Sequence, residues 1–182
     1  MTLTVDAVGS ACDLNDILQT VDTKMLSPES LKKIDREIAK YPPDQKQSAS
    51  MGALRIAQEE KGWLANETIE FVAEYLGMPA IAVYEVASFY NMYDLAPVGA
   101  KKITVCTNLP CALSGGVHAA DYIKKKLGID FNETTADGQF TLKEGECMGA
   151  CGDAPVLLVN NHRMCSWMTE EKIDQLLADL KK

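Results

Sequence analysis

The chain has 182 residues, 47% of them hydrophobic, and a formal net charge of −8 at pH 7. This length allows one ordinary domain or two small ones with a packed apolar core, and the acidic balance argues against nucleic acid as a partner. The longest apolar runs, such as VLLV at residues 156–159, fall far short of the roughly 18 to 20 residues that cross a bilayer, so direct membrane insertion is not expected.

Residues 1–27 are polar and show no sustained hydrophobic period, which predicts a flexible N-terminal tail. This stretch has neither the basic and apolar regions of a secretory signal nor the arginine bias of an organelle transit peptide, so we expect a cytoplasmic protein. In a reducing compartment, 6 cysteines favour metal ligation or thiol chemistry over structural disulfides.

Residues 28–97 carry four successive helical patterns, which predict a small α-helical bundle. Ser27 is placed to cap the first helix, which ends at Tyr41 and two prolines. The second pattern runs from about residue 45 to 60, the third from a cap at Asn66 to Gly77, and the fourth from about 79 to 86. Short connections between these helices favour an antiparallel arrangement.

The stretch SFYNMYDLAPVG, residues 88–99, is rich in aromatic residues and has no helical period. We interpret it as the seam between two domains, with a boundary between residues 97 and 98. Because aromatic side chains dominate such contacts, Phe89, Tyr90 and Tyr93 are expected to pack between the domains rather than to face a partner.

Residues 98–182 change character and predict a small α/β domain. KITV is a strand, residues 114–127 form a helix, and TTADGQFTL forms two short strands around an Asp137-Gly138 turn. PVLLVN is a further strand that pairs with NNHRMCSW, and Thr169 caps a final helix. The order β-α-β-β-β-α fits a sandwich of thioredoxin-like type.

Four cysteines stand out by their spacing. Cys106 and Cys111 form C-x4-C, and Cys147 and Cys151 form C-x3-C, each pair in a loop next to a strand. In a small α/β sandwich the two loops can converge at one end of the sheet, which predicts a metal site.

Three kinds of site compete for these cysteines. Structural zinc is normally held by tighter pairs, although zinc spacing does extend to four residues. A thiol–disulfide centre usually has C-x-x-C at the start of a helix, which neither pair matches. An iron–sulfur cluster is favoured by Gly115, Gly116, Gly149 and Gly152, which allow the backbone to wrap closely and point amide groups at sulfur.

Other cysteine and histidine residues fit the site less well. Cys12 is expected to be a free surface thiol in the tail, and Cys165 a core thiol, rather than further ligands. His118 and His162 have no second ligand at a spacing typical of zinc.

Several segments together resemble a known family. SASMGALRIAQEEKGWL, LGMPAIAVYEVASFYNMYDLAPVG, VCTNLPC, TTADGQFTL and ECMGACGDAP are similar to the E-type subunit of bacterial NADH:quinone oxidoreductase, respiratory complex I, from about residue 28 to the C-terminus. The resemblance implies an α/β, thioredoxin-like [2Fe-2S] ferredoxin domain preceded by a small α-helical bundle. It also implies one [2Fe-2S] cluster held by Cys106, Cys111, Cys147 and Cys151.

The resemblance further implies a function and partners. The chain is expected to transfer single electrons close to the FMN of a partner subunit that binds NADH, and to contact further subunits of the peripheral arm. Through this complex it would lie peripherally on the cytoplasmic side of the inner membrane. The chain has no G-x-G-x-x-G after a strand and no P-loop, so we expect no nucleotide or substrate site of its own. The alternative is the equivalent subunit of an NAD-linked hydrogenase or formate dehydrogenase.

Overall fold

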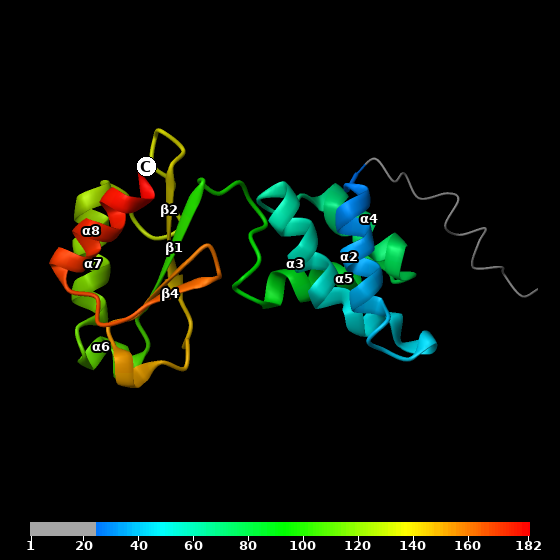
Figure 1. Ribbon diagram of the computed structural model, residues 1–182, viewed down its shortest axis with the longest axis horizontal. Helices are drawn as coiled ribbons and strands as arrows, with labels where there is room; N and C mark the ends of the chain where they lie inside the picture. The colour runs from blue at the N-terminus through cyan, green and yellow to red at the C-terminus, as the bar shows by residue number, and fades with distance from the viewer. Residues whose placement is uncertain (1–24) are drawn as a thin grey trace, which may run out of the picture.

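The computed structural model describes residues 25–182, and its elements form a helical part and an α/β part (Figure 1). The helical part contains α2 (Pro28–Ile38), the 3-10 helix η1 (Pro43–Ala49), α3 (Ser50–Lys61), α4 (Asn66–Leu76) and α5 (Ala80–Phe89). The α/β part begins with strand β1 (Lys101–Cys106). Every helix within the described residues is too short or too polar to span a membrane.

The helical part packs around one apolar core. Ile34 of α2, Leu54 of α3, Val72 of α4 and Val83 of α5 are all fully enclosed in it. The predicted cap of α2 is confirmed, because the Ser27 side chain accepts a hydrogen bond from the Ser30 amide at 3.2 Å. Caps of this kind satisfy amide groups that have no partner within the helix.

Three boundaries in this part differ from the sequence-based expectation. The predicted helix over residues 45–60 is divided, because a 3-10 segment with Gln45 in a non-helical conformation precedes α3. Ala65 holds the N-cap position of α4 in place of Asn66, which is the first helical residue. Helix α5 extends to Phe89, since Ala87 continues the buried face that begins at Val83.

The α/β part contains a sheet of four strands in the order β2-β1-β3-β4. Besides β1, these strands are β2 (Phe140–Gly145), β3 (Leu157–Val159) and β4 (Arg163–Cys165). Strand β2 is parallel to β1, whereas β3 is antiparallel to both β1 and β4. The helices of this part are α6 (Leu109–Leu113), α7 (Gly116–Leu127), η2 (Cys151–Asp153) and α8 (Glu170–Leu180). Apart from the short helices α6 and η2, the elements follow the predicted order β-α-β-β-β-α.

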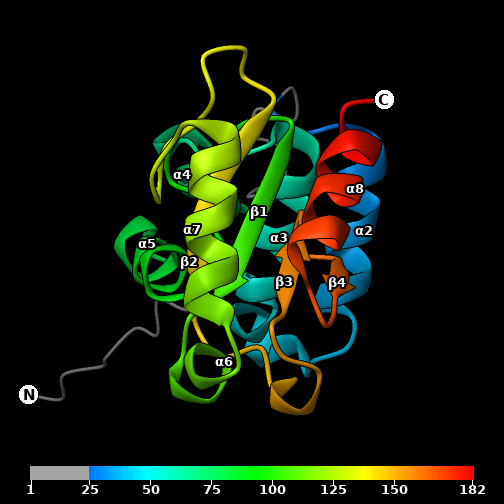
Figure 2. The ribbon, with the colours of Figure 1, turned by 90° about the vertical axis from the view of Figure 1, so that its left-hand side faces the viewer.

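Helices α7 and α8 lie side by side over one face of the sheet (Figure 2). Their apolar side chains, Ile123 and Ile173 among them, pack against Ile103, Leu142 and Leu157 of the strands. The chain crosses from β1 to the parallel strand β2 through α6 and α7, as a parallel pair requires. Thr169 caps α8 as predicted, its side chain accepting from the Lys172 amide.

Two expectations were wrong in part: the two strands predicted in TTADGQFTL and the packing of the aromatic seam. The first of the two strands predicted in TTADGQFTL is reduced to a single bridge between Thr134 and Thr141. Among the aromatic residues of the seam, Tyr93 is buried in the helical core, where its hydroxyl donates to the Met51 carbonyl oxygen at 2.8 Å. Phe89 is 80% exposed, so it does not pack between the two parts.

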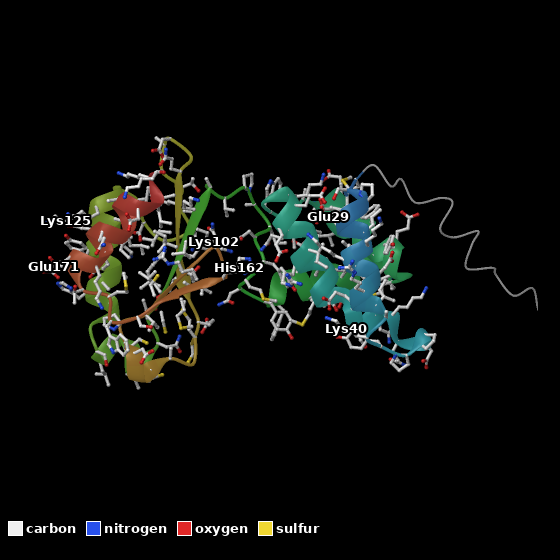
Figure 3. All side chains as sticks on the ribbon, in the orientation of Figure 1. Glu29, Lys40, Lys102, Lys125, His162 and Glu171 are labelled. Atoms are coloured by element: carbon white, nitrogen blue, oxygen red, sulfur yellow. The ribbon has the colours of Figure 1, made fainter. Side chains whose placement is uncertain are left out.

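A polar joint connects the two parts. Asp94 and Lys102 of β1 are both buried and form an ion pair. Lys143 of β2 reaches the second carboxylate oxygen of Asp94, with Nζ 2.8 Å from Oδ1 but outside hydrogen-bond geometry. The Asn161 side chain donates to the Met92 carbonyl oxygen at 2.8 Å. Figure 3 shows Lys102 and His162 on the side of the sheet that faces the helical part.

Candidate metal centre

Both cysteine pairs lie at one end of the sheet. Strands β1 and β2 are parallel and end at Cys106 and Gly145, so the loops that follow them leave the sheet at the same edge. Figures 1 and 2 show α6 and η2 together at this end. We call it the thiol pole and define it as residues 106–118, 144–155 and 166–171.

The first pair forms the inner part of the thiol pole. Cys106 is the last residue of β1 and Cys111 lies within α6, and both are buried. The Cys106 amide donates to the Val156 carbonyl oxygen at 3.2 Å, which ties this loop to the start of β3. Met148 and Ala150 of the second loop pack against the same small cluster, so the two loops are in contact.

The second pair lies at the surface of the pole. Cys147 follows β2 by two residues, Cys151 begins η2, and both side chains are exposed. Gly149 has a φ of 71° and its amide donates to the Cys147 sulfur at 3.4 Å. Amide-to-sulfur hydrogen bonds of this kind tune iron–sulfur clusters and thiolate ligands.

The four thiols influence one another electrostatically. Burial, followed by the hydrogen bond and charge of Cys106 and the charges of Cys151 and Cys147, raises the pKa of Cys111 to about 11. A group of neighbouring thiols resists losing protons because each added negative charge disfavours the next. A bound cation reverses this preference by compensating the charge.

The four cysteine side chains are less closely gathered than the ligands of a closed metal site. Among the described residues, no three His, Cys, Asp or Glu side chains are gathered as metal ligands. The structure thus brings both pairs to one pole, with the first pair inside and the second at the surface. Ligation of one centre by all four cysteines stays a prediction.

Two glycines let the main chain fold tightly beside the first cysteine pair. A Cβ atom on Gly116 would lie 2.7 Å from the Cys106 carbonyl oxygen and 2.8 Å from that of Cys111. Gly115 has a φ of 92°, which side chains rarely allow. These two glycines let the loop fold tightly around its cysteines, and a donor set of sulfur alone suits iron–sulfur ligation.

A backbone brace that sequence patterns did not reveal holds the second loop. The Trp167 amide donates to the Asp153 carbonyl oxygen at 2.7 Å, and the Met168 amide donates to that of Pro155 at 3.0 Å. Trp167 adopts a φ of 49° to make this turn. No side-chain motif marks such contacts, because they join distant segments through main-chain atoms.

The other cysteine and histidine residues considered as ligands are not grouped with the four thiols. Cys165 is half-buried against the core of the sheet, and burial raises its pKa. His118 Nε2 lies 3.5 Å from Glu170 Oε1, and His162 Nε2 lies 3.8 Å from Glu59 Oε1. Both histidines are at the surface. Cys12 lies outside the described residues.

Comparison with known proteins identifies the class. The model of the thioredoxin-like [2Fe-2S] ferredoxin family matches residues 34–181. The chain belongs to this family. The predicted fold class and the prediction of a [2Fe-2S] cofactor are thereby confirmed.

Individual relatives show which type of subunit within this family the chain is similar to. The chain is 47% identical over 143 residues to the E-type subunit of NADH-quinone oxidoreductase from Rickettsia felis, covering 78% of this chain and 85% of the relative. It is 38% identical over 148 residues to NADH-quinone oxidoreductase subunit 2 of Thermus thermophilus, covering 81% and 82% respectively. The resemblance to the E-type subunit is therefore confirmed.

Among solved structures, an NAD+-reducing [NiFe]-hydrogenase is similar in fold. The air-oxidized NAD+-reducing [NiFe]-hydrogenase matches with a TM-score of 0.58 at 18% identity, over 78% of this chain. The match covers 24% of that chain. At this level of identity the likeness extends to the fold alone.

Proposed function

We propose that the chain is the iron–sulfur electron-transfer subunit of an NADH:quinone oxidoreductase, with Cys106, Cys111, Cys147 and Cys151 as the ligands of its cluster. The observation that supports this most is the convergence of both cysteine pairs on one pole in a chain of the thioredoxin-like [2Fe-2S] ferredoxin family. A [2Fe-2S] cluster held there supplies one-electron chemistry, because the group gains or loses a single electron at a time.

The chain's own residues prepare the site for this task. The burial of Cys106 and Cys111 shields one side from water, and the brace at Trp167 holds the loop that carries Cys151. The Gly149 amide offers a hydrogen bond to sulfur, which stabilises added negative charge.

The proposed partner is the subunit that binds NADH and FMN. A flavin converts the two-electron chemistry of NADH into single-electron steps, so a neighbouring one-electron carrier is useful to it. The relatives' names favour NADH:quinone oxidoreductase over the alternative of a hydrogenase or formate dehydrogenase subunit. In this proposal the chain has no nucleotide site of its own and is held peripherally on the cytoplasmic side of the membrane by its complex.

The test is metal analysis and EPR of the full chain purified without oxygen. We expect about two irons and two sulfides per chain and an EPR signal of a reduced [2Fe-2S] centre after dithionite. Cys147→Ser should lower the iron content strongly while the helical part stays folded, and Cys165→Ser should leave the visible spectrum unchanged. A colourless protein with one zinc, or loss of colour in Cys165→Ser, would contradict the ligand assignment.

A further inference from the structure

Two lysines share one buried carboxylate where the helical part meets the sheet. Lys102 of β1 and Lys143 of β2 both lie within ion-pair distance of Asp94. Among the residues that the structure describes, Asp94 is the one carboxylate this close to either lysine. We call these three side chains the joint cluster. Two ammonium groups meet a single carboxylate in it, so its net charge is positive.

The joint cluster lies on the same face of the sheet as the first cysteine. Successive side chains of a strand point to opposite faces, and Ile103 of β1 packs in the core beneath α7 and α8. Lys102 and Cys106 therefore share the other face, and Figure 3 shows Lys102 on the side toward the helical part. Lys143 is paired in register with Thr104, between these two residues of β1.

The joint cluster is close enough to the first cysteine pair for its charge to be felt there. Lys102 precedes Cys106 by four residues of β1, which is about 13 Å at the rise of a strand. The register places Lys143 at about half that separation along the sheet. Water screens charges where it reaches them, but the side chains of Lys102 and Asp94 are only 5% and 2% exposed. The interaction therefore runs through the protein interior with little screening.

Reduction of the proposed iron–sulfur centre changes the charge at these cysteines. One electron, taken from the flavin or from dithionite, adds one negative charge to the iron and sulfur atoms, and no bond needs to break. Positive charge nearby stabilises the added charge, and negative charge opposes it. The net charge of the joint cluster thus favours the reduced form.

We propose that the joint cluster tunes the reduction potential of the iron–sulfur centre, with the two lysines raising the potential and Asp94 limiting the rise. The inference rests on the proposed function, which places the centre at the thiol pole. Asp94, Lys102 and Lys143 act in it as positioning residues, through the electric field rather than by contact with the centre. The joint between the two parts of the molecule then has an electrochemical role besides its structural one.

The test is a redox titration of the full chain with its iron–sulfur centre in place, followed by visible absorption and EPR. Asp94→Asn keeps the shape of the side chain and removes the negative charge, so the midpoint potential should rise. Lys143→Gln removes one positive charge, so the midpoint potential should fall. At a fixed potential, we expect the ratio of reduced to oxidised centre to change about fivefold in each variant, which corresponds to about 40 mV for one electron.

The opposite signs separate this role from a purely structural one. Both variants break the ion pair between Asp94 and Lys143, so loosening of the joint alone would move the midpoint potential in the same direction in both. Lys125→Gln is the control, because Lys125 is exposed on the outer side of α7 (Figure 3) and its charge is screened by water and salt. It should leave the midpoint potential unchanged.

The outcomes distinguish this inference from the proposed function. A midpoint potential that moves in neither variant, or in the same direction in both, would overturn the tuning role and leave the proposed function in place. If Asp94→Asn fails to fold, Lys143→Gln decides alone: a fall supports the inference, and an unchanged or higher potential overturns it. A wild-type chain that shows no [2Fe-2S] signal on reduction would instead overturn the proposed function.

Discussion

Gly116 lies where main chain from two elements meets. Its Cα faces the carbonyl oxygens of Cys106 at the end of β1 and of Cys111 in α6. Both neighbours are backbone atoms, which cannot rotate away as a side chain can. The absence of a side chain at this one residue is therefore what lets α7 begin directly beside the first cysteine pair.

Gly116→Ala is expected to displace this loop. A Cβ at 2.7 Å from one oxygen and 2.8 Å from another forces the backbone to move, at a cost of about 1 to 3 kcal/mol in the free energy of unfolding. We expect the midpoint temperature of thermal unfolding and the iron content per chain both to fall. Gly52→Ala in α3 is the control, since its nearest neighbour is the movable Glu37 side chain. Full iron content in Gly116→Ala would contradict the role assigned to this glycine.

At the scale of elements, α2 and α3 are joined through Ser27, the N-cap of α2, which binds Glu60 of α3. Glu60 near the end of α3 accepts hydrogen bonds from the Ser27 amide at 3.0 Å and from the Ser27 hydroxyl at 2.8 Å. Ser27 in turn caps α2. Hydrogen bonds from Ser30 and Ser27 lower the pKa of Glu60 below its ordinary value of 4.5, and burial opposes them.

Glu60→Gln should therefore reduce stability in a pH-dependent way. A carboxyl whose pKa is lower in the folded state stabilises the fold above its unfolded pKa and loses this effect as the pH falls through the folded pKa. We expect a loss of about 1 kcal/mol in the free energy of unfolding at pH 7, measured by urea denaturation. The difference from the wild type should shrink once the pH drops below 4.5. Glu70→Gln on α4 serves as the comparison, and an equal difference at all pH values would exclude this explanation.

At the scale of the whole molecule, a buried charge cluster sets how the helical part meets the sheet. Asp94 pairs with Lys102 of β1 and approaches Lys143 of β2, while its amide and carbonyl bind Gln58 and Leu64 of the helical part. Burial lowers the pKa of Lys102, and its hydrogen bond to Asp94 opposes this. Since β1 and β2 lead directly into the two cysteine loops, the same strands carry both the joint and the site.

Asp94→Ala should loosen this joint. It leaves two lysine charges without their shared carboxylate, and removing one partner from a buried pair costs about 3 kcal/mol or more. We expect a lower free energy of unfolding by urea and separate transitions for the helical and α/β parts when followed by circular dichroism and by the visible spectrum of the cluster. Asp44→Ala, at an exposed position of η1, should change neither. A single unshifted transition in Asp94→Ala would show that the joint does not couple the two parts.

Much of the architecture was predictable because its causes are local. Ser27 and Thr169 cap helices through neighbouring amides, Gly77 ends α4 in a left-handed conformation, and apolar periodicity marks most helices. Where local signals were weak, prediction failed, as in the polar stretch that became η1 and in the first strand of TTADGQFTL.

The amino-acid sequence by itself determined the caps at Ser27 and Thr169, most of the helical and extended segments, the spacing of the cysteines and the family to which they point, since each depends on residues close together in the chain. Only the tertiary structure decided that Tyr93 belongs to the helical core, that Asp94 meets two lysines and that Trp167 braces the loop of Cys151. These contacts join residues brought together by the path of the whole chain, and no periodicity or spacing encodes that path.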